Sequence, residues 1–295
     1  MVHLLVPIGT ITRSPYQQKA TREWLDSKKR REEKLRYMQM AKNELGGFYF
    51  VLTENVFDDI KPQTATKLIM LCTYLDYSNR LMKTRKTPMK KSDIKEILKL
   101  SKSGAYQFFN EVKDKYIKEY NGTLYITDNS KIFRHNIPQD EKYLQLQKIY
   151  INAVRSLYNP TDAKKHKQLG YVFKLLPHIN LEFNIFCKDP FEKELNNIEP
   201  LTIADLCELV NYDVTQSTRL IKELQSIKFN HNGSEEYLLS FVDNGIDTPF
   251  RKKIYVNPHI IYNGSDYRRV EVLGAFCKVK PRHFVDSAKN SKNSK

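Results

Sequence analysis

The sequence predicts a mainly α-helical α+β fold in which one module of helices and a small β-hairpin occurs twice. Apolar residues recur at helical spacing over most of the 295 residues, and Asn121-Gly122 lies between two segments of alternating polarity. The segment that begins at Pro88 also shares its apolar pattern with the segment that begins at Pro200. A chain with 40% hydrophobic and 12% aromatic residues has enough apolar surface for about two such domains.

Residues 1–47 are expected to form an N-terminal basic helical arm. Sparse apolar positions in a charged field predict a helix over residues 18–45, which Gly46-Gly47 ends, and residues 48–52 then alternate as a short strand does. The four basic residues from Lys28 are followed at once by two glutamates, so much of their charge can pair at i,i+4 spacing. The pattern therefore fits a solvated helix at least as well as a phosphate-binding one.

Residues 48–138 are expected to form the first domain, with three helices followed by a hairpin. Apolar periodicity predicts helices over residues 64–77, 92–98 and 102–115 and strands over residues 116–120 and 123–127. Asn121-Gly122 between these strands favours a type I′ turn, because that turn needs a positive φ at both central positions. This order of elements is that of a winged helix-turn-helix domain.

Residues 139–160 are expected to be a linker, and residues 161–277 a second domain of the same kind. Periodicity predicts a linking helix over residues 140–157, further helices over residues 165–176, 203–210 and 215–225, and strands over residues 227–231, 237–242 and 253–256. Thr202 and Asp205 have the spacing of a capping box at the start of one helix. A final helix over residues 267–278 would bury Val270, Leu273 and Phe276.

The two domains are expected to be copies of one unit. A shift of 112 residues superposes their patterns without a gap for thirty positions. Asp93 then falls on Asp205 and Phe108-Phe109 falls on Leu220-Ile221, so apolar positions coincide although few residues are identical. A match that extends over two helices, their turn and the strands that follow exceeds what chance gives over a single helix.

The second helix of each helix-turn-helix would present its N-terminal part to the major groove of DNA. The helical period buries one stripe in each domain, made of Ala105, Phe108, Phe109 and Val112 in the first and of Ser217, Leu220, Ile221 and Leu224 in the second. The residues left exposed lack carboxylates and suit base edges or phosphates; they are Lys102, Ser103, Tyr106, Gln107 and Asn110 in the first domain and Thr215, Gln216, Thr218, Arg219 and Lys222 in the second. We expect both helices to bind DNA, in successive major grooves if the linker is rigid.

Basic residues outside these helices would add affinity that does not depend on the DNA sequence. The loop at residues 243–252 is expected to be the second wing, whose cations Arg251, Lys252 and Lys253 would meet phosphate or the minor groove. Residues 278–295 hold six Lys and Arg against one acid and are expected to form a basic, disordered tail.

The composition argues against several other classes of protein. The chain has 49 Lys and Arg against 34 Asp and Glu, and its formal charge of +15 points to a polyanionic partner. No apolar segment approaches the roughly 20 residues of a membrane span, and the four cysteines are too widely separated for a zinc site or a disulfide framework. We therefore expect a cytoplasmic, nucleoid-associated protein with no membrane partner, metal or cofactor.

The sequence contains no motif for catalysis. A P-loop and a GxGxxG motif are both absent, and the seven histidines are scattered. The adjacent acids Asp58-Asp59 and Glu235-Glu236 are expected to face solvent, whereas His178 and His259, each next to a proline, are expected to end an element. The protein is therefore expected not to be an enzyme.

The tandem arrangement resembles the winged-helix DNA-binding proteins of plasmids and phages, especially theta-type plasmid replication initiators. The resemblance covers about residues 48–277 and rests on segments 88–117 and 200–229 with their hairpins. Residues 253–264, with the sequence KIYVNPHIIYNG, are also similar to the end of the wing in replication and regulatory proteins of Firmicutes mobile elements. The resemblance implies double-stranded DNA as the partner, replication initiation or transcription regulation as the role, a homodimer formed by one winged helix, and contacts with host replication or transcription machinery.

Two other functions stay open at this point. One is a protein-interaction adaptor, in which a winged helix docks a polymerase or another replisome component. The other is the binding of single-stranded DNA or RNA, which needs aromatic side chains exposed on a sheet or in a groove. We rank the second lower because most of the 18 tyrosines fall on core stripes or strands.

Overall fold

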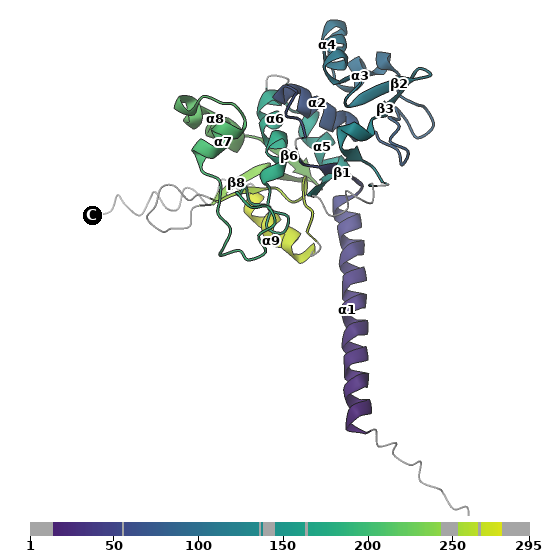
Figure 1. Ribbon diagram of the computed structural model, residues 1–295, viewed down its shortest axis with the longest axis vertical. Coiled ribbons are helices and arrows are strands. Elements are labelled where there is room, and N and C mark those ends of the chain that lie inside the picture. The colour runs from purple at the N-terminus through teal and green to yellow at the C-terminus, as the bar shows by residue number, and fades with distance from the viewer. Residues whose placement is uncertain are drawn as a thin grey trace, which may run out of the picture.

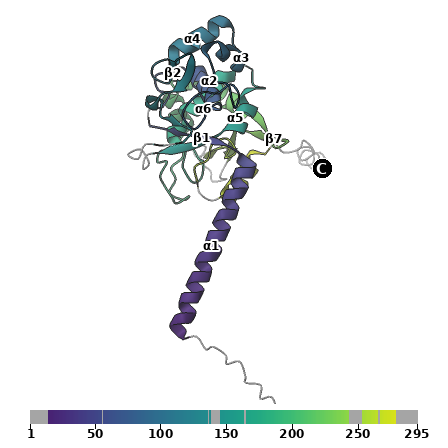
Figure 2. The ribbon, with the colours of Figure 1, turned by 90° about the vertical axis from the view of Figure 1, so that its right-hand side faces the viewer.

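The computed structural model describes residues 14–54, 56–135, 137, 145–162, 165–242, 253–264 and 267–278. These residues form a body of short helices and small antiparallel sheets, from which one long helix projects (Figure 1 and Figure 2). The fold is therefore α+β, as the sequence predicts. Within these ranges, no helix combines the length and the apolar character that crossing a membrane would need.

The projecting helix is α1 (Pro15–Leu45), which confirms the predicted N-terminal helix (Figure 1). Ser14 caps its start, and Gly46, with a φ of 74°, follows its last residue. Its 31 residues extend about 46 Å at the usual rise per residue. Only its C-terminal end packs on the body, where Leu45 is buried, whereas Trp24 is 61% exposed.

The chain then enters a three-stranded antiparallel sheet with the strand order β4-β1-β5. Its strands are β1 (Phe48–Leu52), β4 (Ile132–Phe133), which follows the short helix η2 (Asp128–Ser130), and β5 (Leu146–Tyr150). In β1, Tyr49 and Val51 are fully buried, and both edges of the strand are hydrogen-bonded by its neighbours.

The predicted linking helix over residues 140–157 is wrong in its middle part. Residues 146–150 form β5 and pair with β1 along its whole length, and the helix α5 begins only after them (Ile151–Tyr158). Residues 140–144 lie outside the described residues. The helical periodicity misleads here because a partner strand about 100 residues away in sequence supplies the hydrogen bonds that decide between helix and strand.

We call residues 62–126 the first unit. Its elements are α2 (Pro62–Cys72), η1 (Lys91–Asp93), α3 (Ile94–Ile97), α4 (Lys102–Val112), β2 (Ile117–Tyr120) and β3 (Thr123–Ile126). Ser101 caps α4 by accepting a hydrogen bond from the backbone of Gly104. Asn121 and Gly122 have φ angles of 47° and 71°, which confirms the predicted turn conformation of the hairpin.

We call residues 166–237 the second unit, which has the same order of elements. They are α6 (His166–Lys174), η5 (Leu176–His178), α7 (Ile203–Leu209), η6 (Val214–Gln216), α8 (Ser217–Gln225), β6 (Lys228–His231) and β7 (Ser234–Tyr237). Thr202 and Asp205 form the predicted capping box at the start of α7. The predicted helix over residues 215–225 begins within the short helix η6 and continues as α8.

The hairpin of the second unit lies earlier in the chain than predicted. Asn232 and Gly233, with φ angles of 48° and 84°, join β6 to β7, directly after α8, just as Asn121-Gly122 follows α4. The expected strand over residues 237–242 is divided, because β7 ends at Tyr237 and β8 (Leu239–Val242) pairs instead with β9 (Lys253–Val256). Residues 243–252, expected to be the second wing, lie outside the described residues.

The two units pack directly on each other through α2 and α6, which lie side by side (Figure 1 and Figure 2). A Cβ atom on Gly170 of α6 would lie 1.8 Å from the backbone oxygen of Pro62, so only glycine allows this approach. The Thr66 hydroxyl donates a hydrogen bond of 2.7 Å to the backbone oxygen of His166. One continuous cluster of buried apolar residues consequently runs through both units.

The last described helix, α9 (Tyr267–Cys277), packs beside α1 and β8. Val270 and Leu273 are buried, as predicted. The prediction that Phe276 faces inward is wrong, since that side chain is 50% exposed and its ring stacks on Tyr255 at a centroid distance of 5.6 Å. The four cysteines are all buried and unpaired.

Candidate nucleic-acid interface

The outer face of α4 is exposed, as the helical period predicts. Lys102, Ser103, Tyr106, Gln107 and Asn110 are all exposed, while Ala105, Phe108, Phe109 and Val112 are buried. The helix lies at the end of the body remote from α1, with its exposed face on the molecular surface (Figure 1 and Figure 2). It is therefore sterically free to approach an extended ligand such as a DNA duplex.

Lysines gather beside this face. The Nζ atom of Lys91 lies 4.2 Å from the ring centroid of Phe109 and 5.4 Å from that of Tyr106, which holds a cation against the helix. A depression of about 770 Å³ opens next to it, lined by Lys91, Ser92, Lys95, Lys102, Ser103 and Tyr106, among others. The start of α4 is thus surrounded by positive charge and hydroxyl groups.

Three acids of the first unit have partners other than the lysines at the start of α4. Glu111 accepts hydrogen bonds of 2.9 Å from the backbone of Lys61 and from the Thr64 hydroxyl, which ties it to the start of α2. Asp93 and Glu96 both pair with the Nζ atom of Lys83, at 3.1 and 2.7 Å. Because these carboxylates have partners of their own, the lysines around α4 are not neutralised by them.

The outer face of α8 is also exposed. Thr215, Gln216, Thr218, Arg219 and Lys222 are exposed, and Leu220 and Leu224 are buried as predicted. Ser217 and Ile221, which were also expected to be buried, are half-buried. The two helices therefore offer surfaces of similar shape.

Carboxylates contact the exposed residues of α8, contrary to the expectation of an acid-free surface. The Nε atom of Arg219 lies 3.0 Å from Glu223, one turn further along the helix, and Glu223 also accepts a hydrogen bond from Gln168. At the other end, Asp213 accepts hydrogen bonds from the Thr215 hydroxyl and the Gln216 amide. Three of the five predicted DNA-binding residues on α8 thus already have a carboxylate partner.

The difference between the surroundings of α4 and α8 agrees with the net charges of the two units. The first unit has 13 Lys and Arg against six Asp and Glu, a net charge of +7. The second unit has seven Lys and Arg against 11 Asp and Glu, a net charge of −4. Only the first unit therefore has the electrostatic character that a polyanion favours.

The predicted contacts at the wings are partly outside the described residues. Arg251 and Lys252 belong to that part, and Lys253, the first residue of β9, is half-buried. In the hairpin of the first unit, Lys118 and Glu119 are both exposed. In the hairpin of the second unit, Lys228 pairs with Glu235 at 3.0 Å.

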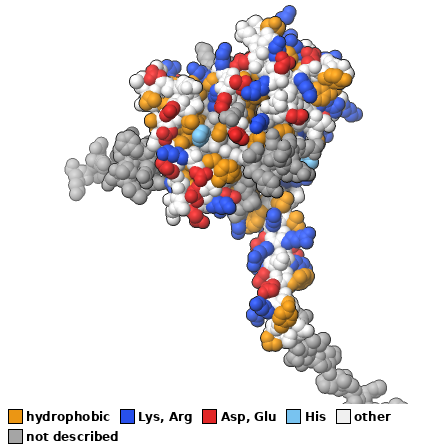
Figure 3. All heavy atoms as spheres, in the orientation of Figure 1, with side chains coloured by type: hydrophobic (Ala, Val, Ile, Leu, Met, Phe, Trp, Pro, Cys, Tyr) orange, Lys and Arg blue, Asp and Glu red, His pale blue; other side chains and the backbone are white. Residues whose placement is uncertain are grey.

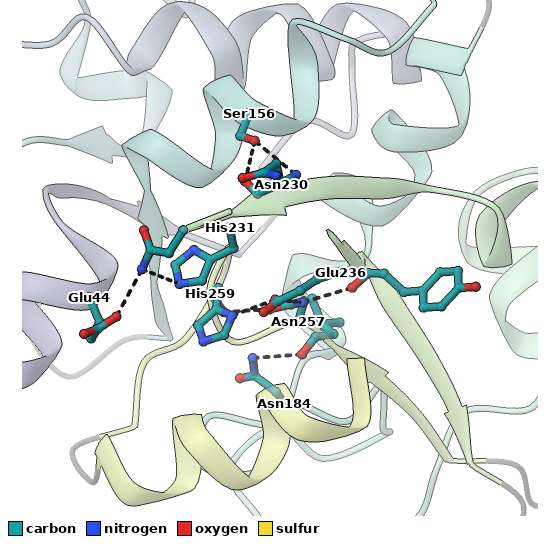
Figure 4. Close-up of polar contacts among 11 residues, drawn as sticks. Glu44, Ser156, Asn184, Asn230, His231, Glu236, Asn257 and His259 are labelled. Atoms are coloured by element: carbon teal, nitrogen blue, oxygen red, sulfur yellow. Dashed lines mark hydrogen bonds and ion pairs between the residues drawn. The ribbon is translucent and has the colours of Figure 1, made fainter. Parts of the chain in front are cut away.

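A buried polar cluster anchors the hairpin of the second unit (Figure 4). Glu236 is 1% exposed; it lies 2.7 Å from the Nδ1 atom of His259 and accepts a hydrogen bond of 2.8 Å from Asn257. The ring of His231 stacks on His259 at 3.9 Å, and Asn232 donates a hydrogen bond to Glu44 at the end of α1. The cluster therefore joins β6, β7, the segment before α9 and α1.

The sequence pattern does not predict this cluster. Glu235-Glu236 was expected to face solvent, which is wrong for Glu236, and His259 does more than end an element because it pairs with that carboxylate. Burial would raise the pKa of Glu236, but the hydrogen bonds from His259 and Asn257 hold it below its usual value. The alternation of β7, which places residue 236 opposite the buried Phe229, was the available signal.

Asp58 and Asp59 are exposed, as predicted. Asp59 also accepts a hydrogen bond of 2.6 Å from the Tyr116 hydroxyl and pairs with Lys115. Over the described ranges, no group of three or more His, Cys, Asp or Glu residues is arranged to hold a metal ion.

Comparisons with protein families, with curated proteins and with solved structures find no match to this chain. The function must therefore be argued from the geometry and the charge of the two units.

Proposed function

We propose that the protein is a sequence-specific double-stranded DNA-binding protein built from two tandem winged helix-turn-helix domains. Each unit has the helix, turn, helix and hairpin order of that domain, with a two-residue Asn-Gly turn in the hairpin. In such domains the second helix of the motif enters the major groove, which assigns α4 and α8 as recognition helices. The resemblance to theta-type plasmid initiators suggests replication initiation or transcription regulation in a plasmid or phage.

The observation that carries this proposal is the outer face of α4. It combines Gln107, Asn110 and Ser103, which can read base edges, with Lys102, which suits a phosphate. The nearby acids are held by other groups, and the unit has a net charge of +7. We therefore assign the principal DNA contact to the first unit.

The charge of the second unit favours a second candidate role for that unit. With a net charge of −4 and its exposed Arg219 paired to Glu223, the second unit resembles a surface that docks a basic protein partner more than one that binds a polyanion. We propose that α8 contacts DNA only if Arg219 breaks its ion pair with Glu223 and hydrogen-bonds to the edge of a guanine base. Otherwise the second unit serves as an adaptor, through a second copy of the chain or host machinery.

Selection of bound fragments from a random duplex library at about 0.2 M salt tests the proposal, because non-specific binding is weak there. We expect the wild-type protein to enrich one sequence. Gln107→Ala should relax the preference at one base position, whereas the matched control Gln225→Ala, at the exposed end of α8, should leave it unchanged. Lys102→Ala should weaken binding to all duplexes alike. The slope of log affinity against log salt concentration should become shallower by about one.

The proposal fails if no sequence is enriched, or if Gln107→Ala and Gln225→Ala select the same site as the wild type. In that case α4 does not read the major groove, and the adaptor function becomes the better account of the exposed helices.

A further inference from the structure

A groove lies at the other end of the body, where α1 joins it. It has a volume of about 710 Å³ and is walled by the end of α1, β1, β5 and the start of α9. That volume is within the range of about 300–1,000 Å³ typical of small-molecule sites. Because α4 lies at the end of the body remote from α1, the groove is separate from the proposed duplex contact (Figure 1 and Figure 2).

Aromatic side chains line the groove. In β1 the side chains alternate, so Tyr49 and Val51 enter the core while Phe48 and Phe50 line the groove and are only half-buried. The rings of Phe48 and Phe50 meet edge to face at a centroid distance of 5.2 Å. Tyr77, which also lines the groove, is 67% exposed. The solvated face of a small antiparallel sheet normally carries polar residues, so these rings point to a ligand.

Cations line the same groove. Arg134 lies over the ring of Tyr77 at 5.4 Å, and Lys148 lies over the ring of Phe48 at 5.8 Å. The Arg134 guanidinium also lies against Gly47, 3.0 Å from where a Cβ atom would be. Lys34 and Lys42 add two exposed ammonium groups from α1, and none of the lining residues is Asp or Glu.

The ammonium of Lys148 is partly removed from water. Burial lowers its pKa, while the charge of Glu182 works in the opposite direction. Glu182 itself pairs with Arg269 at 2.7 Å, so it is not a dedicated partner of Lys148. A half-buried cation without its own carboxylate is stabilised when an anion enters the groove.

Partly exposed aromatic rings beside cations, in a lining without carboxylates, match the chemistry of a nucleotide strand. Bases stack on aromatic side chains whatever their identity, and phosphates pair with Lys and Arg. An acidic peptide would use the cations but not the rings, and an apolar helix would use the rings but leave the cations unpaired. Charge and shape together favour nucleic acid.

We propose that this groove binds single-stranded DNA, with bases stacking on Phe50 and Tyr77 and phosphates held by Lys148 and Arg134. Lys34 and Lys42 of α1 add positive charge at the groove, on a helix whose Lys and Arg side chains lie among hydrophobic and acidic ones (Figure 3). The binding is sequence-tolerant, since stacking requires only the faces of the bases. This function is distinct from duplex recognition by α4.

Fluorescence anisotropy with a labelled oligo-dT of about 12 nucleotides tests the proposal, because that strand cannot form a duplex and its length is within the range of known single-strand sites. We expect Tyr77→Ala and Lys148→Met each to weaken binding about tenfold in the full-length protein. The control Phe191→Ala removes another exposed ring (53% exposed) from a segment that does not line the groove, and should leave the affinity unchanged. Because Tyr77 is exposed, its removal is expected to leave the fold intact, and circular dichroism of the variants tests this.

Three outcomes would overturn the proposal. The first is that the wild type does not bind oligo-dT, and the second is that Tyr77→Ala and Phe191→Ala bind it equally well. The third is that thymidine monophosphate binds as tightly as the oligonucleotide, which would make the groove a site for free nucleotides. Lys102→Ala is expected to keep oligo-dT binding, so a failure of duplex recognition by α4 is distinguishable from a failure here.

Discussion

In the first unit α4 leads into a hairpin that turns at Asn121-Gly122, and in the second unit α8 leads into one that turns at Asn232-Gly233. The two backbones thus follow the same plan, yet the net charges of the units are +7 and −4. Apolar spacing and turn residues determine the backbone, whereas surface charge is free to differ. A shared fold therefore does not imply a shared partner.

The hairpins differ in what they bury. In the first unit the inner face of β3 buries Leu124 and Ile126, so the hairpin is held by apolar packing. In the second unit β7 buries Glu236, which is held by His259 and Asn257. The second hairpin is consequently attached to the segment before α9 by a directional polar contact, which makes it sensitive to substitutions that preserve shape.

Separating the two units should have the largest effect. Gly170→Ala places a methyl group against the Pro62 backbone, which cannot move aside as a side chain can, so we expect the free energy of unfolding to fall by about 3 kcal/mol or more. Urea denaturation followed by circular dichroism measures the change. Gly104→Ala in α4, where the nearest atom is a Ser101 hydroxyl at 3.2 Å, is the control and should change stability by less than about 1 kcal/mol.

If both glycine variants unfold at the same urea concentration, the α2–α6 contact does not join the units. The two units would then be independent domains rather than two halves of one core.

The polar anchor of the second hairpin should have the next largest effect. Because the pKa of Glu236 is held below its usual value in the folded state, this carboxylate adds stability at neutral pH that is lost as the pH falls below about 4.5. Glu236→Gln should lower the free energy of unfolding by about 1–3 kcal/mol at pH 7. The variant should also lose less stability than the wild type between pH 5 and pH 3. Thermal melts across that pH range provide the measurement.

Glu235→Gln serves as the comparison variant, because its side chain is 58% exposed and pairs only with Lys228. An exposed pair of this kind contributes little, so its melting curve should stay close to that of the wild type at each pH. Equal losses in the two variants would show that the buried cluster does not hold the hairpin.

The smallest effect is expected at α8. Arg219→Ala should cost about 1 kcal/mol of duplex affinity and relax the preference at one base position if α8 enters the groove. Glu223→Gln should instead strengthen binding several-fold, since it releases the guanidinium and removes a negative charge. Competition binding with the selected duplex measures both changes. If neither substitution changes the affinity for that duplex, α8 does not contact DNA.

Local signals in the sequence predicted much of each unit. The helical stripes of α4 and α8, the Thr202–Asp205 capping box and the Asn121-Gly122 turn all depend on residues within a few positions of one another. Asn232-Gly233 carries the same turn signal, although the basic residues 251–253 further along favour a later position for the wing. The charge of each unit can likewise be counted once its boundaries are known.

Contacts between distant segments decided the rest. Residues 146–150 are a strand only because β1 pairs with them, Gly170 matters only because Pro62 lies against it, and Glu236 is buried only because His259 and Asn257 reach it. The groove beside α1 arises in the same way, from four elements far apart in the chain. The sequence alone determined which segments turn and which faces are apolar, because those properties are local; tertiary structure decided pairing, polar burial and cavities, because each depends on what a distant segment brings into contact.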